Sequence, residues 1–162
     1  PDMIQKLQDE DALPTQLYLS TNAADYESFM KINKPKYDDS WERWNKTLDM
    51  LKHLNTRTVL RITLIKDYND QRESIPAFAE MFRKASPHFI EIKSYMHIGR
   101  STNRLEYENM LEMDEVKNFS EEIAKQSKIF SIMDESIVSR ISILQNNERF
   151  IDRFISTYAN TI

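Results

Sequence analysis

The chain has 162 residues, of which 40% are hydrophobic and 30% are charged, and its formal net charge is −4. This length suits one globular domain with a hydrophobic core of its own. The sequence contains no cysteine, which excludes disulfides, thiolate nucleophiles and iron–sulfur ligation by this chain. Its three histidines are scattered and form no helix-spaced pair, so we expect no metal site.

Nothing in the sequence indicates export or insertion into a membrane. No apolar run approaches the ~20 residues that a membrane-spanning helix needs. The first residues do not form a basic segment followed by an apolar one, as a signal peptide does. We therefore expect a cytoplasmic protein without a membrane partner. The chain begins with Pro1 and not with methionine, which suggests a piece of a longer protein.

The first part of the chain alternates strands with helices. A helical or irregular lead-in over 2–12 precedes a predicted strand at 15–21, and a short helix is expected at 25–33. The next helix is predicted to run to about 53, because its apolar residues recur every three or four positions. Asp39 and Glu42 have the spacing of a capping box at its start.

The same alternation continues after this helix. A second strand is predicted at 58–65, a helix from Ser74, and a third strand at 88–96. Alternating strands and helices are typical of βαβ units and a parallel sheet.

The last third of the chain begins with an irregular stretch that reaches about Met113. Asp114 is expected to cap a helix, and two strands at 129–133 and 138–144 are expected to pair. A last short helix is predicted from Glu148.

Each of the three predicted parallel strands has one apolar and one polar face. The polar faces carry Gln16, Tyr18 and Ser20, then Arg61 and Thr63, then Glu91, Lys93 and Tyr95. A sheet covered by helices on both faces has near-continuous apolar strands instead. The pattern therefore indicates part of a barrel, whose polar side lines a cavity and whose chemistry lies at the carboxyl ends of the strands.

Three βα units amount to half of such a barrel. Half a barrel leaves open sheet edges, which natural proteins pair or cover. We therefore expect residues 1–104 to form the second half of a partial α/β barrel with parallel strands. Residues 105–162 are expected to form a C-terminal α/β appendage.

The polar strand face supplies the first candidate site residues. Arg61 and Thr63 could bind a carboxylate or phosphate in the cavity, or they could lie on a solvated antiparallel strand. Glu91 and Lys93 are neighbours on one face. A desolvated lysine can form a Schiff base with a carbonyl compound, and Glu91 could tune it. The alternative is a structural ion pair inside the barrel.

The segment after the third strand supplies a second group. It contains Gly99, the only glycine of the chain, followed by Arg100, Asn103 and Arg104. These side chains suit phosphate or carboxylate recognition, and the alternative is a solvated loop. His97 beside the glycine is a weaker candidate for acid–base chemistry.

Further candidates are scattered along the chain. Lys34 and Lys36, on either side of a proline, could contact an RNA backbone or simply be solvated. Tyr95 could stack on a base. Arg140 could either pair with Asp134 or Glu135 in a structural role or serve in binding.

Several segments together resemble one family in order and spacing. They are Leu13–Ser20, Trp41-Glu42-Arg43, Arg57–Lys66, Phe89–Met96, Asn103-Arg104-Leu105 with Asn109-Met110, and Asp134-Glu135-Ser136 with Ser139-Arg140. They are similar to the C-terminal half of the archaeal tRNA 4-demethylwyosine synthases. These are radical S-adenosylmethionine enzymes that modify a guanosine next to the anticodon of phenylalanine tRNA.

The resemblance implies a radical-SAM-type (β/α)6 partial barrel with its wyosine-formation region. It implies a carbon–carbon lyase type of reaction in wybutosine biosynthesis, in which pyruvate carbons are condensed onto N1-methylguanosine of tRNA. The implied cofactors are S-adenosylmethionine and [4Fe-4S] clusters of the complete enzyme. None of the cluster ligands can lie in this cysteine-free chain, so the segment alone is expected to be inactive without the missing N-terminal half.

The resemblance also implies roles for individual residues. Ser20 and Asn22 would face the ribose of the cofactor, and Arg61 and Thr63 would lie near its polar groups. The catalytic candidates Glu91 and Lys93, with Tyr95, would line the cavity that the methylguanosine enters. The implied RNA contacts are Arg100, Asn103, Arg104, Arg140, Lys34 and Lys36.

The sequence departs from the family pattern at three positions. Asn22 stands where an aspartate is usual, Leu111 where proline is common, and Arg100 where a less basic residue is expected. Two other functions stay open. One is a carbonyl-handling barrel enzyme with Lys93 as its Schiff-base lysine, and the other is a non-catalytic RNA-binding module.

Overall fold

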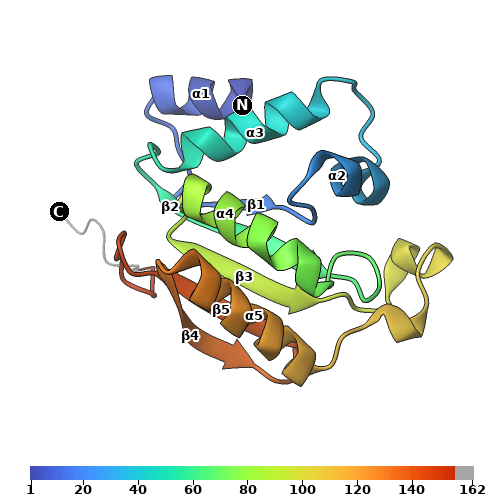
Figure 1. The fold of residues 1–162 in the computed structure, drawn as a ribbon. Coiled ribbons are helices and arrows are strands. Elements are labelled where there is room, and N and C mark those ends of the chain that lie inside the picture. Colours follow the sequence, from blue (N-terminus) through green and yellow to red (C-terminus); the bar gives the residue numbers. More distant parts are fainter. Residues whose placement is uncertain (156–162) are drawn as a thin grey trace.

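The computed structural model describes residues 1–155 as one mixed α/β unit (Figure 1). Its helices are α1 (Asp2–Asp9), α2 (Tyr26–Asn33), α3 (Ser40–Leu51), α4 (Ile75–Ala85) and α5 (Met113–Ser127). Its strands are β1 (Gln16–Ser20), β2 (Arg57–Leu64), β3 (Phe89–Ser94), β4 (Phe130–Ser136) and β5 (Ile141–Asn146). Three short 3-10 turns lie at Arg72–Ser74, Gly99–Asn103 and Tyr107–Asn109.

The five strands form one sheet in the order β1-β2-β3-β5-β4. β1, β2 and β3 are parallel, which confirms the predicted parallel strands. β5 runs antiparallel to β3, and β4 pairs antiparallel with β5, so the predicted pairing of the last two strands is also confirmed. The turn between these two strands falls a few residues later than predicted. The expected boundary at 104 lies in the connection between β3 and α5, and both sides contribute strands to the sheet.

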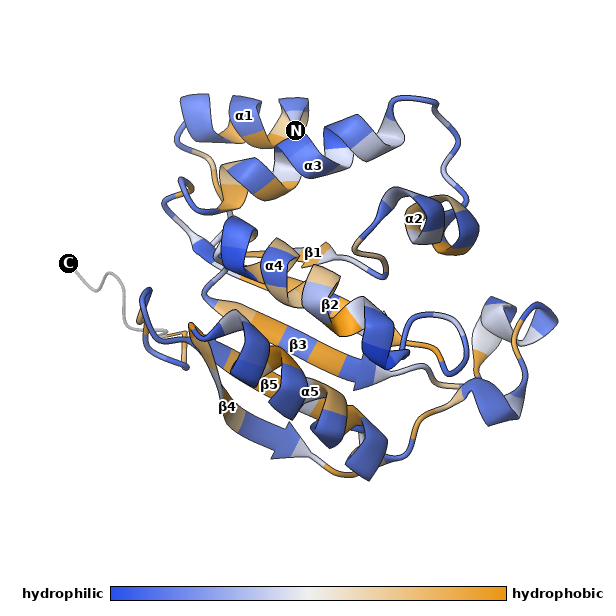
Figure 2. Cartoon of the chain, viewed as in Figure 1, coloured by the Kyte–Doolittle hydropathy of each residue, from blue (hydrophilic) through white to orange (hydrophobic). Residues whose placement is uncertain are grey.

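Helices α3, α4 and α5 cover one face of this sheet and form the hydrophobic core with it. Leu51, Phe82 and Ile123 from the three helices are fully buried. They belong to one cluster with strand residues such as Ile62 and Ile92. Figure 2 shows the apolar positions of α4 and α5 alternating with polar ones, as expected for helices that cover a sheet. The core therefore occupies only one side of the sheet.

The caps of two helices differ from the prediction, although α3 begins where it was expected. The Asp25 carboxylate accepts a bond from the Ser28 N–H at the start of α2, as an N-cap does. Asp39 precedes α3 but makes no side-chain cap bond. The cap of α5 is Glu112 and not Asp114, because Glu112, two residues earlier, forms a reciprocal capping box with Glu115.

The predicted last helix is wrong over 148–155, and its remainder lies outside the described residues. Residues 149–155 instead form an irregular segment that crosses the other sheet face. The buried Arg57 guanidinium donates to the carbonyl oxygens of Asp152, Arg153 (2.8 Å) and Phe154 (3.1 Å). It also lies 5.4 Å from the centre of the Phe89 ring. Because the buried guanidinium donates hydrogen bonds to these carbonyl oxygens, residues 149–155 need no helical hydrogen bonds to satisfy them.

No helix in the part of the chain described by the structure is long and apolar enough to cross a membrane.

Candidate functional site

The predicted polar face of the sheet is present, and it has a covered region and an open region. Near the amino ends of the strands, Val59 and Phe89 are buried beside residues 149–155. Near the carboxyl ends, Ser20 is exposed, and Thr63 and Lys93 are half-buried. The uncovered region therefore coincides with the end of a parallel sheet at which α/β enzymes place their chemistry.

Strand register brings the predicted residues of this face together. Ser20 lies opposite Arg61, which in turn lies opposite Glu91. Thr63 lies opposite Lys93. Because directly paired residues of neighbouring strands point to the same side, these side chains share one surface patch.

Glu91 is the centre of a polar cluster on this face. Its carboxylate accepts a bond from Arg61 Nε at 2.8 Å and from the Tyr18 hydroxyl at 3.1 Å. The Arg61 guanidinium lies 4.7 Å from the centre of the Tyr18 ring. Burial and then the nearby Glu91 carboxylate raise the pKa of Tyr18. Glu91 thus pairs with Arg61, and its two carboxylate oxygens are both engaged.

Lys93 stands beside this cluster without belonging to it. It is the only lysine in the five strands. No carboxylate of residues 1–155 lies within ion-pair distance of its amine, so neither the predicted tuning by Glu91 nor the alternative Glu91–Lys93 ion pair is present as a direct contact. The amine is therefore available to a ligand on the open face.

Hydrogen bonds of two asparagine side chains, Asn22 and Asn69, fix the backbone at the carboxyl edge of the sheet. The Asn22 side-chain oxygen accepts a bond from the Thr63 backbone N–H at 3.0 Å. Asn69 donates to the carbonyls of Asn22 (2.9 Å) and Thr63 (3.0 Å), and its own oxygen accepts from the Ile65 N–H. Sequence reasoning missed Asn69, although a turn asparagine just after a strand is a known signal for such bonds. The Asn22 NH2 group can still donate to a ligand.

The segment after β3 carries the predicted anion-binding residues on the surface. Arg100 and Asn103 lie in the 3-10 turn that begins at Gly99, and Arg104 follows; all three are exposed. Gly99 has a φ of +63°, which explains the only glycine of the chain. Tyr95 is buried, and its hydroxyl bonds with His97 Nδ1 at 3.1 Å.

Arg140 and the two predicted lysines lie elsewhere. Arg140 sits in the turn before β5, where it donates to the Leu111 carbonyl at 3.0 Å and pairs with Glu112 at 3.0 Å. These contacts are structural, but the expected partners were wrong, since Asp134 pairs with Arg153 and Glu135 with Lys117. Lys34 ends α2 in the left-handed region, and Lys36 lies over the Tyr37 ring, both on the exposed connection to α3.

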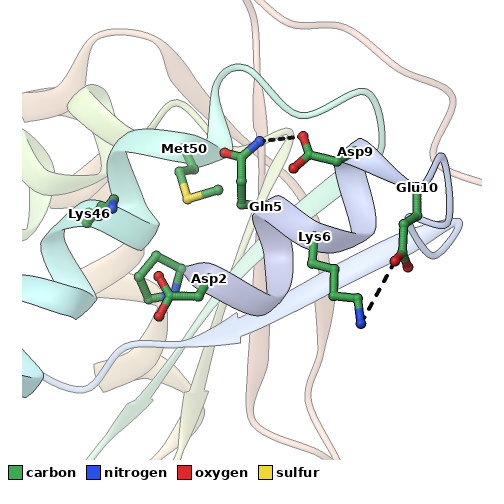
Figure 3. A pocket seen from close by; sticks show the side chains of 8 residues that line it. Asp2, Gln5, Lys6, Asp9, Glu10, Lys46 and Met50 are labelled. Carbon is green, nitrogen blue, oxygen red and sulfur yellow. Dashed lines mark hydrogen bonds and ion pairs between the residues drawn. The ribbon is translucent and has the colours of Figure 1, made fainter.

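A groove of about 440 Å³ between α1 and α3 contains none of the predicted site residues (Figure 3). Its polar side chains contact one another, as in the Gln5–Asp9 hydrogen bond and the Lys6–Glu10 ion pair. Among residues 1–155, no group of three His, Cys, Asp or Glu side chains could hold a metal ion. The polar sheet face therefore remains the best candidate site.

Comparison with known proteins adds a family to this geometry. A family model described as "Wyosine base formation" matches residues 84–146. The tRNA 4-demethylwyosine synthase of Pyrococcus abyssi is 37% identical over 148 residues, which cover 91% of this chain and 43% of that protein. The synthase of Methanocaldococcus jannaschii is 41% identical over 153 residues, which cover 93% and 45%.

Solved structures agree with these relatives. A structure of TYW1 with a lysine-pyruvate adduct bound has a TM-score of 0.78 and 40% identity, covering 88% of this chain and 44% of that one. A crystal structure of archaeal TYW1 has a TM-score of 0.70 and 36% identity, covering 90% and 45%. The chain thus spans less than half the length of these proteins. By sequence and by fold, as its motifs predict, this chain belongs to the tRNA 4-demethylwyosine synthase family.

Proposed function

We propose that this chain is the C-terminal half of a radical S-adenosylmethionine enzyme that uses pyruvate to convert N1-methylguanosine of phenylalanine tRNA into 4-demethylwyosine. The observation that carries the proposal is the open polar face at the carboxyl ends of β1, β2 and β3. Parallel sheets are normally covered on both faces, so a polar face left open beside three parallel strands supports a cavity that another part of the protein completes. A tRNA-modifying enzyme of this kind would act in the cytoplasm.

The sheet edge supports a partial barrel completed by a missing half. β1 lies at one end of the sheet and pairs only with β2 among the described strands. A parallel strand from the N-terminal half could add to this edge and curve around the polar face. On this proposal residues 1–104 are the barrel half, and residues 105–162 are the appendage that supplies β4 and β5.

The cofactors would be held mainly by the other half. Because this chain has no cysteine, the [4Fe-4S] clusters would be ligated outside it. For S-adenosylmethionine, the exposed Ser20 hydroxyl, the half-buried Thr63 hydroxyl and the Asn22 NH2 group are suitable hydrogen-bonding groups. Arg61 fits less well, since Glu91 already neutralises it.

Lys93 is our candidate for the lysine that handles pyruvate. One related structure carries a lysine-pyruvate adduct, and Lys93 is the half-buried strand lysine beside the open face. A neutral lysine amine would attack the ketone carbon of pyruvate, and the carbinolamine so formed would lose the former ketone oxygen as water to give an imine. Borohydride reduces such an imine to a stable adduct, which mass spectrometry can map.

The complete protein, loaded with its clusters, should form 4-demethylwyosine on tRNA that contains N1-methylguanosine when S-adenosylmethionine and pyruvate are present. Nucleoside mass spectrometry would detect the product, and its absence from a cluster-loaded protein would refute the proposed function. A borohydride adduct on a lysine outside this chain would refute the covalent role of Lys93 alone. A trapped Lys93 in protein that neither holds iron nor modifies tRNA would favour the simpler carbonyl-handling enzyme.

Arg100, Asn103 and Arg104 are our candidates for contact with the anticodon stem-loop, because they are exposed beside the same edge of the sheet. Lys34 and Lys36 could extend this contact along the phosphate backbone. Arg140 would act indirectly, by holding the turn before β5. If the chain is an RNA-binding module instead, it should bind tRNA tightly without the missing half.

A further inference from the structure

An aromatic ladder runs outward from the end of β3 to the protein surface. The rings of Tyr95 and His97 lie 6.2 Å apart at 88°, and those of His97 and Tyr107 lie 6.2 Å apart at 70°. Tyr95 is buried, with 5% of its surface exposed, whereas Tyr107 is 63% exposed. The ladder thus has a fixed inner end and a free outer ring.

Hydrogen bonds hold the ladder in place. The Tyr95 hydroxyl bonds with His97 Nδ1 at 3.1 Å, and the backbone N–H of His97 donates to the Met110 sulfur at 3.3 Å. These contacts restrain His97 from both sides. Since edge-to-face aromatic contacts stabilise such pairs further, the middle ring has a defined orientation.

The turn that carries Tyr107 is also anchored. Glu106 and Asn109 form a reciprocal capping box around it. Asn109 donates to the Lys66 carbonyl at 3.1 Å and accepts the Lys66 N–H on its own carbonyl at 2.9 Å. The turn is therefore tied to the loop after β2, and Tyr107 is exposed without being on a free loop.

The surroundings of Tyr107 favour an RNA base as its partner. The exposed Arg100 and Arg104 lie in the same connection and can contact phosphates, while the exposed Glu106 and Glu108 balance their charge. With these charges balanced, attraction to the phosphate backbone of an RNA contributes little to binding at this surface. An exposed, preorganised ring instead binds through the face of an unstacked base.

We propose that Tyr107 is a stacking platform for an unpaired nucleotide of the anticodon loop, held next to the cavity that receives the methylguanosine. This inference rests on the proposed function, because it requires a tRNA substrate. A base that enters a barrel must leave its stack, and an aromatic ring at the mouth can replace the lost stacking of its neighbour. Tyr107 acts here in substrate binding, and Tyr95 and His97 are positioning residues.

The test uses the complete enzyme and an anticodon stem-loop that contains N1-methylguanosine, with 2-aminopurine as the neighbouring base. Tyr107→Leu should weaken binding about 5- to 100-fold, since it removes the ring but keeps an apolar side chain. Tyr107→Phe keeps the ring and should bind as the wild type does. Quenching of 2-aminopurine fluorescence should persist with Tyr107→Phe and be lost with Tyr107→Leu.

Salt dependence separates stacking from charge. The slope of log Kd against log salt should stay unchanged in Tyr107→Leu, because no phosphate contact is removed. Wild-type affinity of Tyr107→Leu, or equal losses in the Leu and Phe variants, would overturn the inference while leaving the proposed function intact. A lower melting temperature with unchanged RNA affinity would also overturn it, since the ring would then pack against the rest of the enzyme. Failure of the wild-type enzyme to bind tRNA would overturn both.

Discussion

Arg57 should control whether residues 149–155 stay on the sheet. Its guanidinium is buried and donates to three successive backbone carbonyls, from Asp152 to Phe154. Arg57→Met keeps the apolar stem against Phe89 but removes every donor. A hydrogen bond from a charged group contributes about 1.5–3 kcal/mol. Because water would solvate the Arg57 guanidinium once the segment opens, we take about 2 kcal/mol for its three bonds together. This corresponds to a roughly 30-fold larger population of the open segment.

Limited trypsin proteolysis measures this opening directly, because the segment contains Arg149 and Arg153 as cleavage sites. Cleavage after Arg153 should be roughly 30-fold faster in Arg57→Met than in the wild type, since its rate follows the open population. Cleavage after the exposed Arg104 serves as an internal standard and should not change. Arg72→Met, at an exposed arginine before α4, is the matched control. A wild-type rate after Arg153 in Arg57→Met would refute the anchoring role.

Two further predictions concern stability. Arg61→Met should destabilise the chain by about 1–3 kcal/mol in urea unfolding, because it leaves the Glu91 carboxylate buried and short of a partner. The double variant Arg61→Met/Glu91→Leu should be more stable than Arg61→Met. If the changes in the free energy of unfolding of the two single variants simply added up in the double variant, the Arg61–Glu91 pairing would be contradicted. Burial, Arg149 and Arg57 lower the pKa of His88 to about 4, whereas an unfolded histidine titrates near 6.5. The unfolded chain therefore takes up this proton first, so the stability contribution is present above about pH 6.5 and is lost as the pH falls to about 4. Because His88 is partly exposed, we expect this stability contribution to be on the order of 1 kcal/mol. His88→Asn keeps an acceptor for the Thr58 N–H and should remove this pH dependence; an unchanged profile would count against the assignment.

Much of the fold could be predicted because its signals are local. Alternation in the strands and apolar spacing in the helices identified the parallel strands β1, β2 and β3 and the helices between them. Asp25 was predictable as the start of α2, since its side chain caps the helix within four residues of sequence. The last helix failed because tertiary contacts decided it. Arg57, far away in sequence, satisfies the carbonyls that a helix would have used.

The site was predictable as a face but not as a set of contacts. Period-two alternation placed Arg61, Glu91 and Lys93 on one side, and the register confirms that they share it. Sequence spacing suggested Glu91 as the partner of Lys93, yet Glu91 pairs across strands with Arg61. Cross-strand distance depends on register, which a single strand's sequence does not contain. Asn69 was missed although its bonds with Ile65 and Thr63 are local; only its bond to the Asn22 carbonyl depends on a distant segment.

The central claim is that the open polar face lines the substrate cavity of the complete enzyme, and the most direct test is product formation by a Lys93 variant. Lys93→Met should lower 4-demethylwyosine formation at least about 100-fold at saturating pyruvate, if its amine handles the substrate carbonyl. Lys84→Met, which removes an exposed lysine that pairs with Asp49 on the helical side, should keep the wild-type rate. A wild-type rate in a folded, cluster-loaded Lys93→Met enzyme would contradict the account.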